Sequence, residues 1–206
     1  NKSMIQLGDT PVISKIIDSY PTKAEFIVIT GYKGNHLKEY LALIYPNRKI
    51  KIINVKLFDG PGSGLTYSLR NSLSYIKKPF FFNANDTIFT DKNFFKNIKN
   101  DTMFLSKANC DTMKYATVEI NNGNAKIHNK LNYLRKDYFN YTGVAYIKNI
   151  NLFKNIIKNS SVNEGELSYF KNLDPNKINY KFVSGWYDIG SNETKENAEK
   201  FFSSKD

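Results

Sequence analysis

Short apolar segments alternate with stretches of helical periodicity through the first half of the chain. Residues 25–30, 49–55 and 80–83 are short and rich in apolar side chains, which is typical of strands buried in a sheet. Between them, apolar residues recur every three or four positions, which predicts amphipathic helices. The expected helices cover residues 12–20, 37–44 and 65–76. Strands and helices that alternate at this spacing favour a parallel sheet covered by helices.

The second half of the chain has a different pattern. Residues 115–130 are predicted to form a β-hairpin, because Asn121-Asn122-Gly123-Asn124 separates two alternating segments. Further strands are expected at 102–105, 141–147 and 178–183, and helices near 94–98, 152–157 and 164–170 and after Ser191. The expected fold is therefore a single α/β domain, with a mostly parallel central sheet, helices on both faces and a hairpin in the second half.

The composition is that of a basic protein of domain size. A chain of 206 residues is long enough for one domain with its own core. The 30 Lys and Arg against 19 Asp and Glu give a net charge of +11, which favours anionic partners such as nucleotides and phosphorylated metabolites. Because the lysines are dispersed and form no basic stripe with interleaved aromatics, nucleic acid is not the expected partner.

Cysteine content and hydropathy indicate the cellular compartment of the protein. The single cysteine, Cys110, excludes an internal disulfide and favours a reducing compartment. No apolar run approaches the roughly 20 residues that span a bilayer, and residues 1–4 lack the pattern of a signal peptide. We therefore expect a cytoplasmic protein without a membrane partner; its oligomeric state stays open, a homo-oligomer included.

Two carboxylates are the strongest candidates for chemistry. Asp86 follows the aromatic strand at 80–83, and Asp188 follows a later apolar and aromatic segment. The carboxyl ends of strands are where open α/β sheets bind ligands, and Mg²⁺ commonly takes one or two protein carboxylates. Taken alone, Asn85-Asp86-Thr87 is equally well explained as a simple turn. The two histidines and Cys110 are isolated in sequence, so neither a zinc site nor a Cys/His nucleophile is expected.

A glycine-rich loop at residues 59–64 precedes the third predicted helix. Glycines allow the backbone to approach a base or phosphate closely, and a helix that begins near Leu65 offers unpaired N–H groups to an anion. Proline and glycine also punctuate ordinary turns. The loop therefore supports a nucleotide site only in combination with other features.

Several motifs, in the same order, resemble the sugar-nucleotidyltransferase family. Residues 2–13 resemble its Pro-Lys-x-Leu segment, Gly62-Ser63-Gly64 its base-contacting Gly-Thr-Gly loop, and Asn85-Asp86 its metal-binding Gly-Asp. Residues 141–145 are similar to its Asn-x-Gly strand, and residues 186–191, Trp-Tyr-Asp-Ile-Gly-Ser, to its Trp-x-Asp-Ile-Gly-Thr motif, which is the most specific. The resemblance implies a Rossmann-like nucleotidyltransferase fold and a compact, cytidylyltransferase-like member of bacterial capsule or cell-surface biosynthesis.

The resemblance also implies a reaction. A phosphate oxygen of a small phosphorylated acceptor attacks the α-phosphorus of a nucleoside triphosphate, and pyrophosphate leaves. CTP is the expected donor, with GTP and UTP left open. The compact second half suits a small phosphorylated sugar, or a phospho-compound such as phosphocholine or phosphoglutamine, as acceptor.

The family's functional residues map onto this sequence motif by motif. Asp86 and Asp188 are implied as Mg²⁺ ligands, and Lys2 as a contact to the phosphates. For Glu166 an exposed helical position is an alternative, and for Trp186 a plain core position. The implied nucleotide contacts are Gly31, Tyr32, Gly62, Ser63 and Asn85, and the implied acceptor contacts are Lys130, Thr142, Gly143, Glu166 and Trp186.

The sequence departs from the family at its start and near the hairpin. The family's first strand and its Gly-x-Gly-x-Arg phosphate loop have no counterpart in residues 1–206, so we expect both to precede Asn1 in the parent protein. His128-Asn129-Lys130 stands where many members have Glu-Lys-Pro. One rival interpretation is a metal-dependent glycosyltransferase of related fold, which typically uses an Asp-x-Asp pair that residues 83–86 lack. The other is a non-catalytic nucleotide- or nucleic-acid-binding domain.

Overall fold

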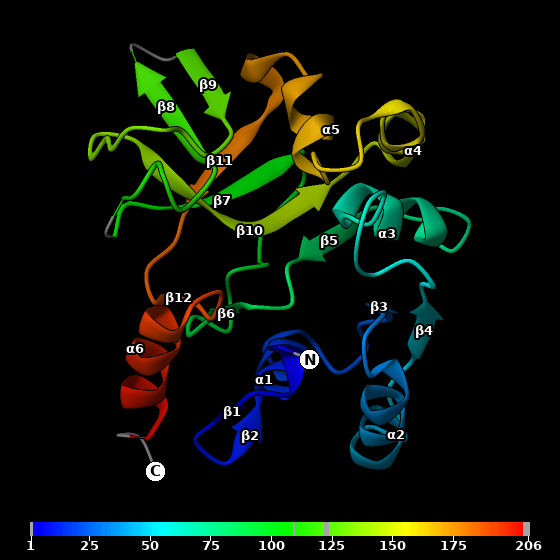
Figure 1. The fold of residues 1–206 in the computed structure, drawn as a ribbon. Helices are drawn as coiled ribbons and strands as arrows, with labels where there is room; N and C mark the ends of the chain where they lie inside the picture. Colours follow the sequence, from blue (N-terminus) through cyan, green and yellow to red (C-terminus); the bar gives the residue numbers. More distant parts are fainter. Residues whose placement is uncertain (1, 109, 122–123, 204–206) are drawn as a thin grey trace.

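The structure, a computed structural model, describes residues 2–108, 110–121 and 124–203 (Figure 1). The first half contains η1 (Lys2–Met4), β1 (Gln6–Leu7), β2 (Thr10–Pro11), α1 (Val12–Ser19), β3 (Phe26–Thr30), α2 (Gly34–Ile44), β4 (Ile50–Asn54), α3 (Leu65–Ser72), β5 (Phe80–Asn83) and β6 (Thr87–Phe89). The second half contains β7 (Thr102–Ser106), β8 (Thr117–Asn121), β9 (Asn124–His128), β10 (Phe139–Ile147), α4 (Ile150–Asn159), α5 (Leu167–Lys171), η2 (Pro175–Lys177), β11 (Asn179–Phe182), β12 (Trp186–Asp188) and α6 (Asn192–Ser203). The predicted α/β class is confirmed.

The large sheet is built around β10. This strand is antiparallel to β7 on one side, and to β5 and β8 on the other; β11 adds to β7 in parallel, and β9 pairs with β8. The predicted sheet was mostly parallel, but the described strands of the large sheet pair mostly antiparallel, so this part of the prediction is wrong. The alternation of strands and helices suggested that β5 would pair in parallel with β4, whereas it pairs antiparallel with β10.

Helices α3, α4 and α5 pack their apolar stripes on one face of the large sheet. Leu69 of α3, Phe153 of α4 and Tyr169 of α5 pack with buried residues of β7 and β10. Helix α4 begins at Asn149, whose side chain accepts a hydrogen bond from the Leu152 amide at 3.1 Å, which is the interaction expected of a good N-cap residue. On the other face, Phe89, Phe94 and Phe104 form an aromatic cluster.

Strands β3 and β4 form a separate parallel pair, on which α1 and α2 pack. Within the described residues β3 pairs only with β4, and β5 only with β10. As a result the aromatic strand β5 lies at a sheet edge with its side chains half-buried, not buried on both faces as the sequence pattern indicates. A further strand and phosphate loop before residue 1 stay a prediction.

Two local predictions have a different outcome. Residues 94–98 form turns and not a helix, because the Asp91 side chain accepts from the Asn93 amide and Asn97 adopts a left-handed φ of 62°. The hairpin is confirmed by the antiparallel β8–β9 pair, whereas the predicted Asn122-Gly123 turn lies outside the described residues. None of the helices in the described ranges combines the length and the apolar character needed to cross a membrane.

A short antiparallel ribbon pairs β6, from the middle of the chain, with β12, which precedes α6 (Figure 1). Its Ile88 is buried together with Ile189, with Val12 of α1 and with Ala198 of α6. Beside this ribbon, β10 changes register between Tyr141 and Ala145, and Gly143 lies inside this irregularity with a φ of +79°. The Gly143 carbonyl accepts from the Ala84 amide at 2.9 Å, so the irregularity supports the turn that leads into β6.

We expect Gly143→Ala to destabilise the fold more than Gly60→Ala. Both glycines have a φ of +79°, but a Cβ at Gly143 would lie 3.0 Å from Cβ of Ala84 and 3.2 Å from Oγ1 of Thr87, whereas nothing lies within 4 Å at Gly60. Backbone strain costs about 1–2 kcal/mol at each site, and crowding adds about 1 kcal/mol or more at Gly143. Urea unfolding of both variants measures the difference, and equal losses would contradict the role given to Gly143.

Candidate active site

The β6–β12 ribbon brings Asp86 and Asp188 together. Asp188 ends β12 and lies opposite Thr87, the first residue of β6, in the antiparallel register. The Ile189 amide donates to the Asp86 carbonyl at 2.9 Å, which extends the pairing by one more residue. The two carboxylates that the sequence predicts as partners therefore lie at the same end of one ribbon.

Lys2 lies beside this carboxylate pair. Its Nζ is 3.9 Å from Oδ2 of Asp86 and 3.3 Å from the carbonyl oxygen of Gly190, which follows β12. About half of the Lys2 side chain is exposed, so the ion pair is open to solvent. Lys2 thus contacts both strand ends and leaves its charge accessible to an anion.

Charge is unevenly balanced around Asp86. Burial raises the pKa of Asp86, and the nearby Asp188 carboxylate raises it further, while Lys2 and Lys130 lower it. Lys130 follows β9 in the sequence, so the hairpin contributes to the electrostatics of the pair. The site is a partly buried pair of carboxylates that repel each other and are incompletely neutralised by the protein's own cations.

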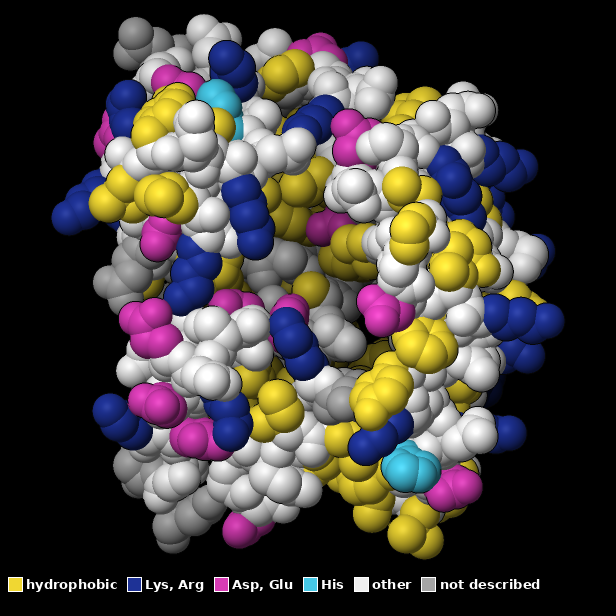
Figure 2. All heavy atoms as spheres, in the orientation of Figure 1, with side chains coloured by type: hydrophobic (Ala, Val, Ile, Leu, Met, Phe, Trp, Pro, Cys, Tyr) yellow, Lys and Arg dark blue, Asp and Glu magenta, His cyan; other side chains and the backbone are white. Residues whose placement is uncertain are grey.

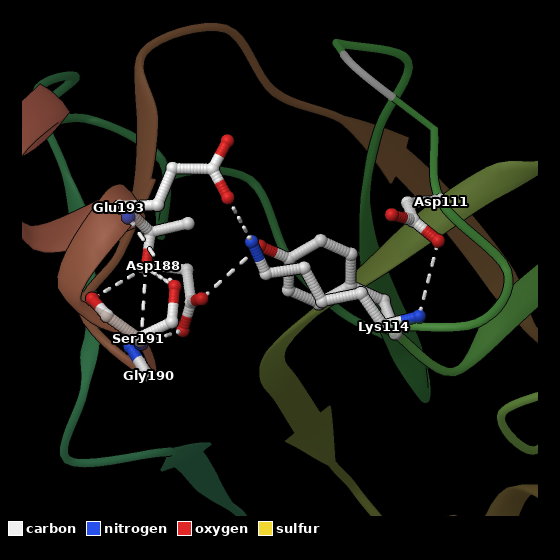
Figure 3. Close-up of polar contacts among 8 residues, drawn as sticks. Asp111, Lys114, Asp188, Gly190, Ser191 and Glu193 are labelled. Carbon is white, nitrogen blue, oxygen red and sulfur yellow. Dashed lines mark hydrogen bonds and ion pairs between the residues drawn. The ribbon is translucent and has the colours of Figure 1, made fainter.

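Asp188 is held by two donors of the protein. Its Oδ1 accepts from the Gly190 amide at 3.1 Å, and its Oδ2 accepts from the Tyr115 hydroxyl at 3.0 Å. Figure 3 shows Asp188 next to Gly190 and Ser191 at the start of α6, with Lys114 directed toward Glu193. Burial and the Asp188 charge raise the pKa of Tyr115, so its hydroxyl stays protonated at neutral pH. Tyr115 is not among the site residues predicted from the sequence, since no local pattern links it to a partner on β12.

A cavity of about 330 Å³ lies next to the carboxylates. Its walls come from the ends of β3 and β4, the glycine-rich loop and the start of α3. Ser3 and Asn85, the sequence neighbours of Lys2 and Asp86, form its edge. In Figure 2 the molecule is visibly hollowed at its centre, with Lys, Arg, Asp and Glu side chains around the hollow. Of the residues predicted to contact the nucleotide, Gly31, Tyr32, Ser63 and Asn85 line this cavity, and Gly62 does not.

Two residues predicted to contact the acceptor have structural partners. Thr142 is buried; its hydroxyl donates to the Phe104 carbonyl at 2.9 Å, and its carbonyl accepts from the Thr87 hydroxyl at 2.8 Å. Gly143 supports the turn at Ala84. Both residues hold the turn that contains Asp86 through their carbonyl oxygens, which accept from Thr87 and Ala84. Their contacts to an acceptor stay predictions.

Solved structures with the same architecture are nucleotidyltransferases. No family model matches the sequence, and no curated protein matches it. A putative glucose-1-phosphate thymidylyltransferase from Bacillus anthracis superposes with a TM-score of 0.78 at 17% identity, over 98% of this chain and 87% of that one. CTP:phosphocholine cytidylyltransferase from Streptococcus pneumoniae gives 0.76 at 14% identity, over 97% and 89%. The inositol-1-phosphate CTP transferase from T. maritima gives 0.72 at 18%, over 100% and 87%.

The chain has the nucleotidyltransferase fold. This agrees with the order of motifs in the sequence. At identities of 14–18% the likeness shows the fold alone.

Two further predicted acceptor contacts have buried polar atoms without a hydrogen-bond partner among the described residues. Glu166 is 4% exposed; its Oε1 accepts from the Tyr141 hydroxyl at 2.9 Å, and its Oε2 has no partner. Burial raises the pKa of Glu166 to about 7. Trp186 is half-buried, with its Nε1 also unpartnered. The exposed-helix alternative for Glu166 is therefore wrong: the residue precedes α5 and is buried, because residues 162–165 fold over the start of α3 through the Gly165 amide and the Thr66 hydroxyl.

We expect Glu166→Gln to alter how stability depends on pH. An acid whose folded pKa is raised from 4.5 to about 7 stabilises the fold at low pH and loses that contribution as pH rises through 7. The wild type should therefore lose about 2 kcal/mol between pH 5 and pH 8 that the variant does not lose. Urea unfolding across this range measures the effect. Glu164→Gln, two residues away and less buried, is the control; parallel curves for the wild type and Glu166→Gln would refute a buried, titrating Glu166.

Proposed function

We propose that this protein transfers a nucleoside monophosphate from a nucleoside triphosphate to a small phosphorylated acceptor, with release of pyrophosphate. The observation that carries the proposal is the grouping of Lys2, Asp86 and Asp188. Their sequence neighbours Ser3 and Asn85 line the cavity. Partly buried like charges are an unfavourable arrangement that is often found at functional sites, and the solvent-accessible Lys2 beside them could bind a phosphate.

The chemistry proposed for this site needs positioning and charge neutralisation. A phosphate oxygen of the acceptor would form a bond to the α-phosphorus, and the bond from that phosphorus to the α,β-bridging oxygen would break, so that pyrophosphate takes the electron pair. Lys2 would bind the phosphates with its exposed ammonium group, and Lys130 would approach from the hairpin side. Neither role requires a protein nucleophile.

The residues present fit a magnesium ion. Mg²⁺ is commonly held by one or two carboxylates and by substrate phosphates, and the mutual repulsion that raises the pKa of Asp86 is what a divalent cation relieves. Asp86 and Asp188 would hold the ion, which when bound stabilises charge on the attacking and leaving oxygens. Residues 2–108, 110–121 and 124–203 contain no cluster of three or more potential metal ligands, so the substrate phosphates would complete the coordination.

The cavity is the proposed site of the nucleoside. Its volume and its lining of Gly31, Tyr32, Ser63 and Asn85 support this, because backbone and small polar groups at loop glycines can approach a base closely. We propose CTP as donor, because two of the structures with this fold are described as CTP transferases. The proposed acceptor is a phosphorylated sugar, phosphocholine or a similar small compound, and the proposed setting is the cytoplasmic synthesis of cell-surface precursors.

The central test is pyrophosphate release by variants of the carboxylates. The wild type is incubated with Mg²⁺, each nucleoside triphosphate and a panel of phosphorylated acceptors. Asp86→Ala and Asp188→Ala should each lower kcat at least about 100-fold, since each removes a proposed ligand of the cation that would neutralise charge in the transition state, while circular dichroism and the melting temperature stay close to those of the wild type.

The matched control is Glu39→Ala, which removes an exposed carboxylate on α2, remote in sequence from the ribbon. Its rate should equal that of the wild type. Release of no pyrophosphate with any pair of substrates would refute the transferase proposal, and rates near those of the wild type in both Asp variants would refute the assignment of the metal ligands.

A further inference from the structure

Asp86 and Asp188 differ in how the protein holds them. Asp86 has a solvent-accessible ion pair to Lys2 at 3.9 Å, which is a loose contact. Asp188 has a hydrogen bond on each oxygen, from the Gly190 amide and from the Tyr115 hydroxyl. Since two donors on different segments fix the plane of a carboxylate, the orientation of Asp188 is set by the protein itself.

Tyr115 is a well-fixed donor. Its ring meets that of Trp186 edge to face, with 5.0 Å between the centroids, and Trp186 stands two residues before Asp188 on β12. Packing of the ring thus directs the hydroxyl toward Asp188. The hydrogen bond joins residues 73 positions apart, so it depends on the tertiary fold and not on a local turn.

A second contact joins the same two segments. Lys114 Nζ lies 3.4 Å from Oε2 of Glu193 at the start of α6, and the Lys114 amide donates to Asp111 Oδ1 (Figure 3). The segment 111–115, which leads into β8, is therefore tied to the residues after β12 at adjacent positions. Glu193 is largely exposed, so this ion pair contributes little to the stability of the fold.

We propose that Tyr115 is a positioning residue for the metal site: its hydroxyl holds Asp188 in the orientation in which that carboxylate binds a divalent cation. This rests on the proposed function. A carboxylate that is already oriented loses less conformational freedom on binding the cation, so affinity is higher than for a freely rotating one.

The test is Mn²⁺ binding by the wild type and by Tyr115→Phe, which keeps the ring against Trp186 and removes only the hydroxyl. Trp186 is the only tryptophan in the chain, so paramagnetic quenching of its fluorescence reports binding at the site directly. Electron paramagnetic resonance of free Mn²⁺ gives an independent binding curve. Tyr115→Phe should bind Mn²⁺ about tenfold more weakly, with an unchanged melting temperature.

Tyr133→Phe is the matched control, because it removes a hydroxyl from a half-exposed tyrosine that follows the same hairpin. It should bind Mn²⁺ like the wild type. Equal affinities of Tyr115→Phe and the wild type would overturn the positioning role while leaving the metal site intact. A wild type that does not bind Mn²⁺, or binding that persists in Asp188→Ala, would instead overturn the proposed metal site and this inference with it.

Discussion

Pairing of β12 with β6 is the constraint on which the candidate site depends. The two strands come from distant parts of the sequence, and only their antiparallel register places Asp188 opposite Thr87 and therefore next to Asp86. The ribbon is buried through Ile88 and Ile189, which pack against Val12 of α1 and Ala198 of α6. Apolar burial near both ends of the chain thus stabilises an arrangement that brings two negative charges together.

The same arrangement explains why buried polar groups gather around the site. The Thr87 hydroxyl donates to the Thr142 carbonyl, and the Thr142 hydroxyl donates to the Phe104 carbonyl of β7; these bonds fix the turn that carries Asp86. A buried polar group costs free energy unless it is hydrogen-bonded, so a satisfied network at this point makes the turn rigid. Two of the four buried side-chain atoms without a partner in the described residues, Oε2 of Glu166 and Nε1 of Trp186, belong to residues that family resemblance assigns to the acceptor.

How far the sequence predicts this molecule depends on whether the signal is local. Most of the helices, the β8–β9 hairpin and the α/β class follow from periodicity and turn residues, which act over a few positions; the helix predicted at 94–98 is the exception. Pairing of β5 with β10 was not predictable in this way, because strand partners are chosen by tertiary packing. For the site, the motifs around Asp86 and Asp188 predicted the two carboxylates. The Tyr115 hydroxyl and the burial of Glu166 were not predictable, since each depends on contacts between segments remote in sequence.

The central claim is that Asp86 and Asp188 hold one divalent cation beside a nucleotide in the cavity. A crystal structure of the protein with CTP and Mn²⁺, with anomalous diffraction at the manganese edge, tests it most directly. We predict an anomalous peak between the two carboxylates, with the cytosine against Gly31 and Ser63. Manganese bound elsewhere, or a nucleotide bound away from this cavity, would contradict it.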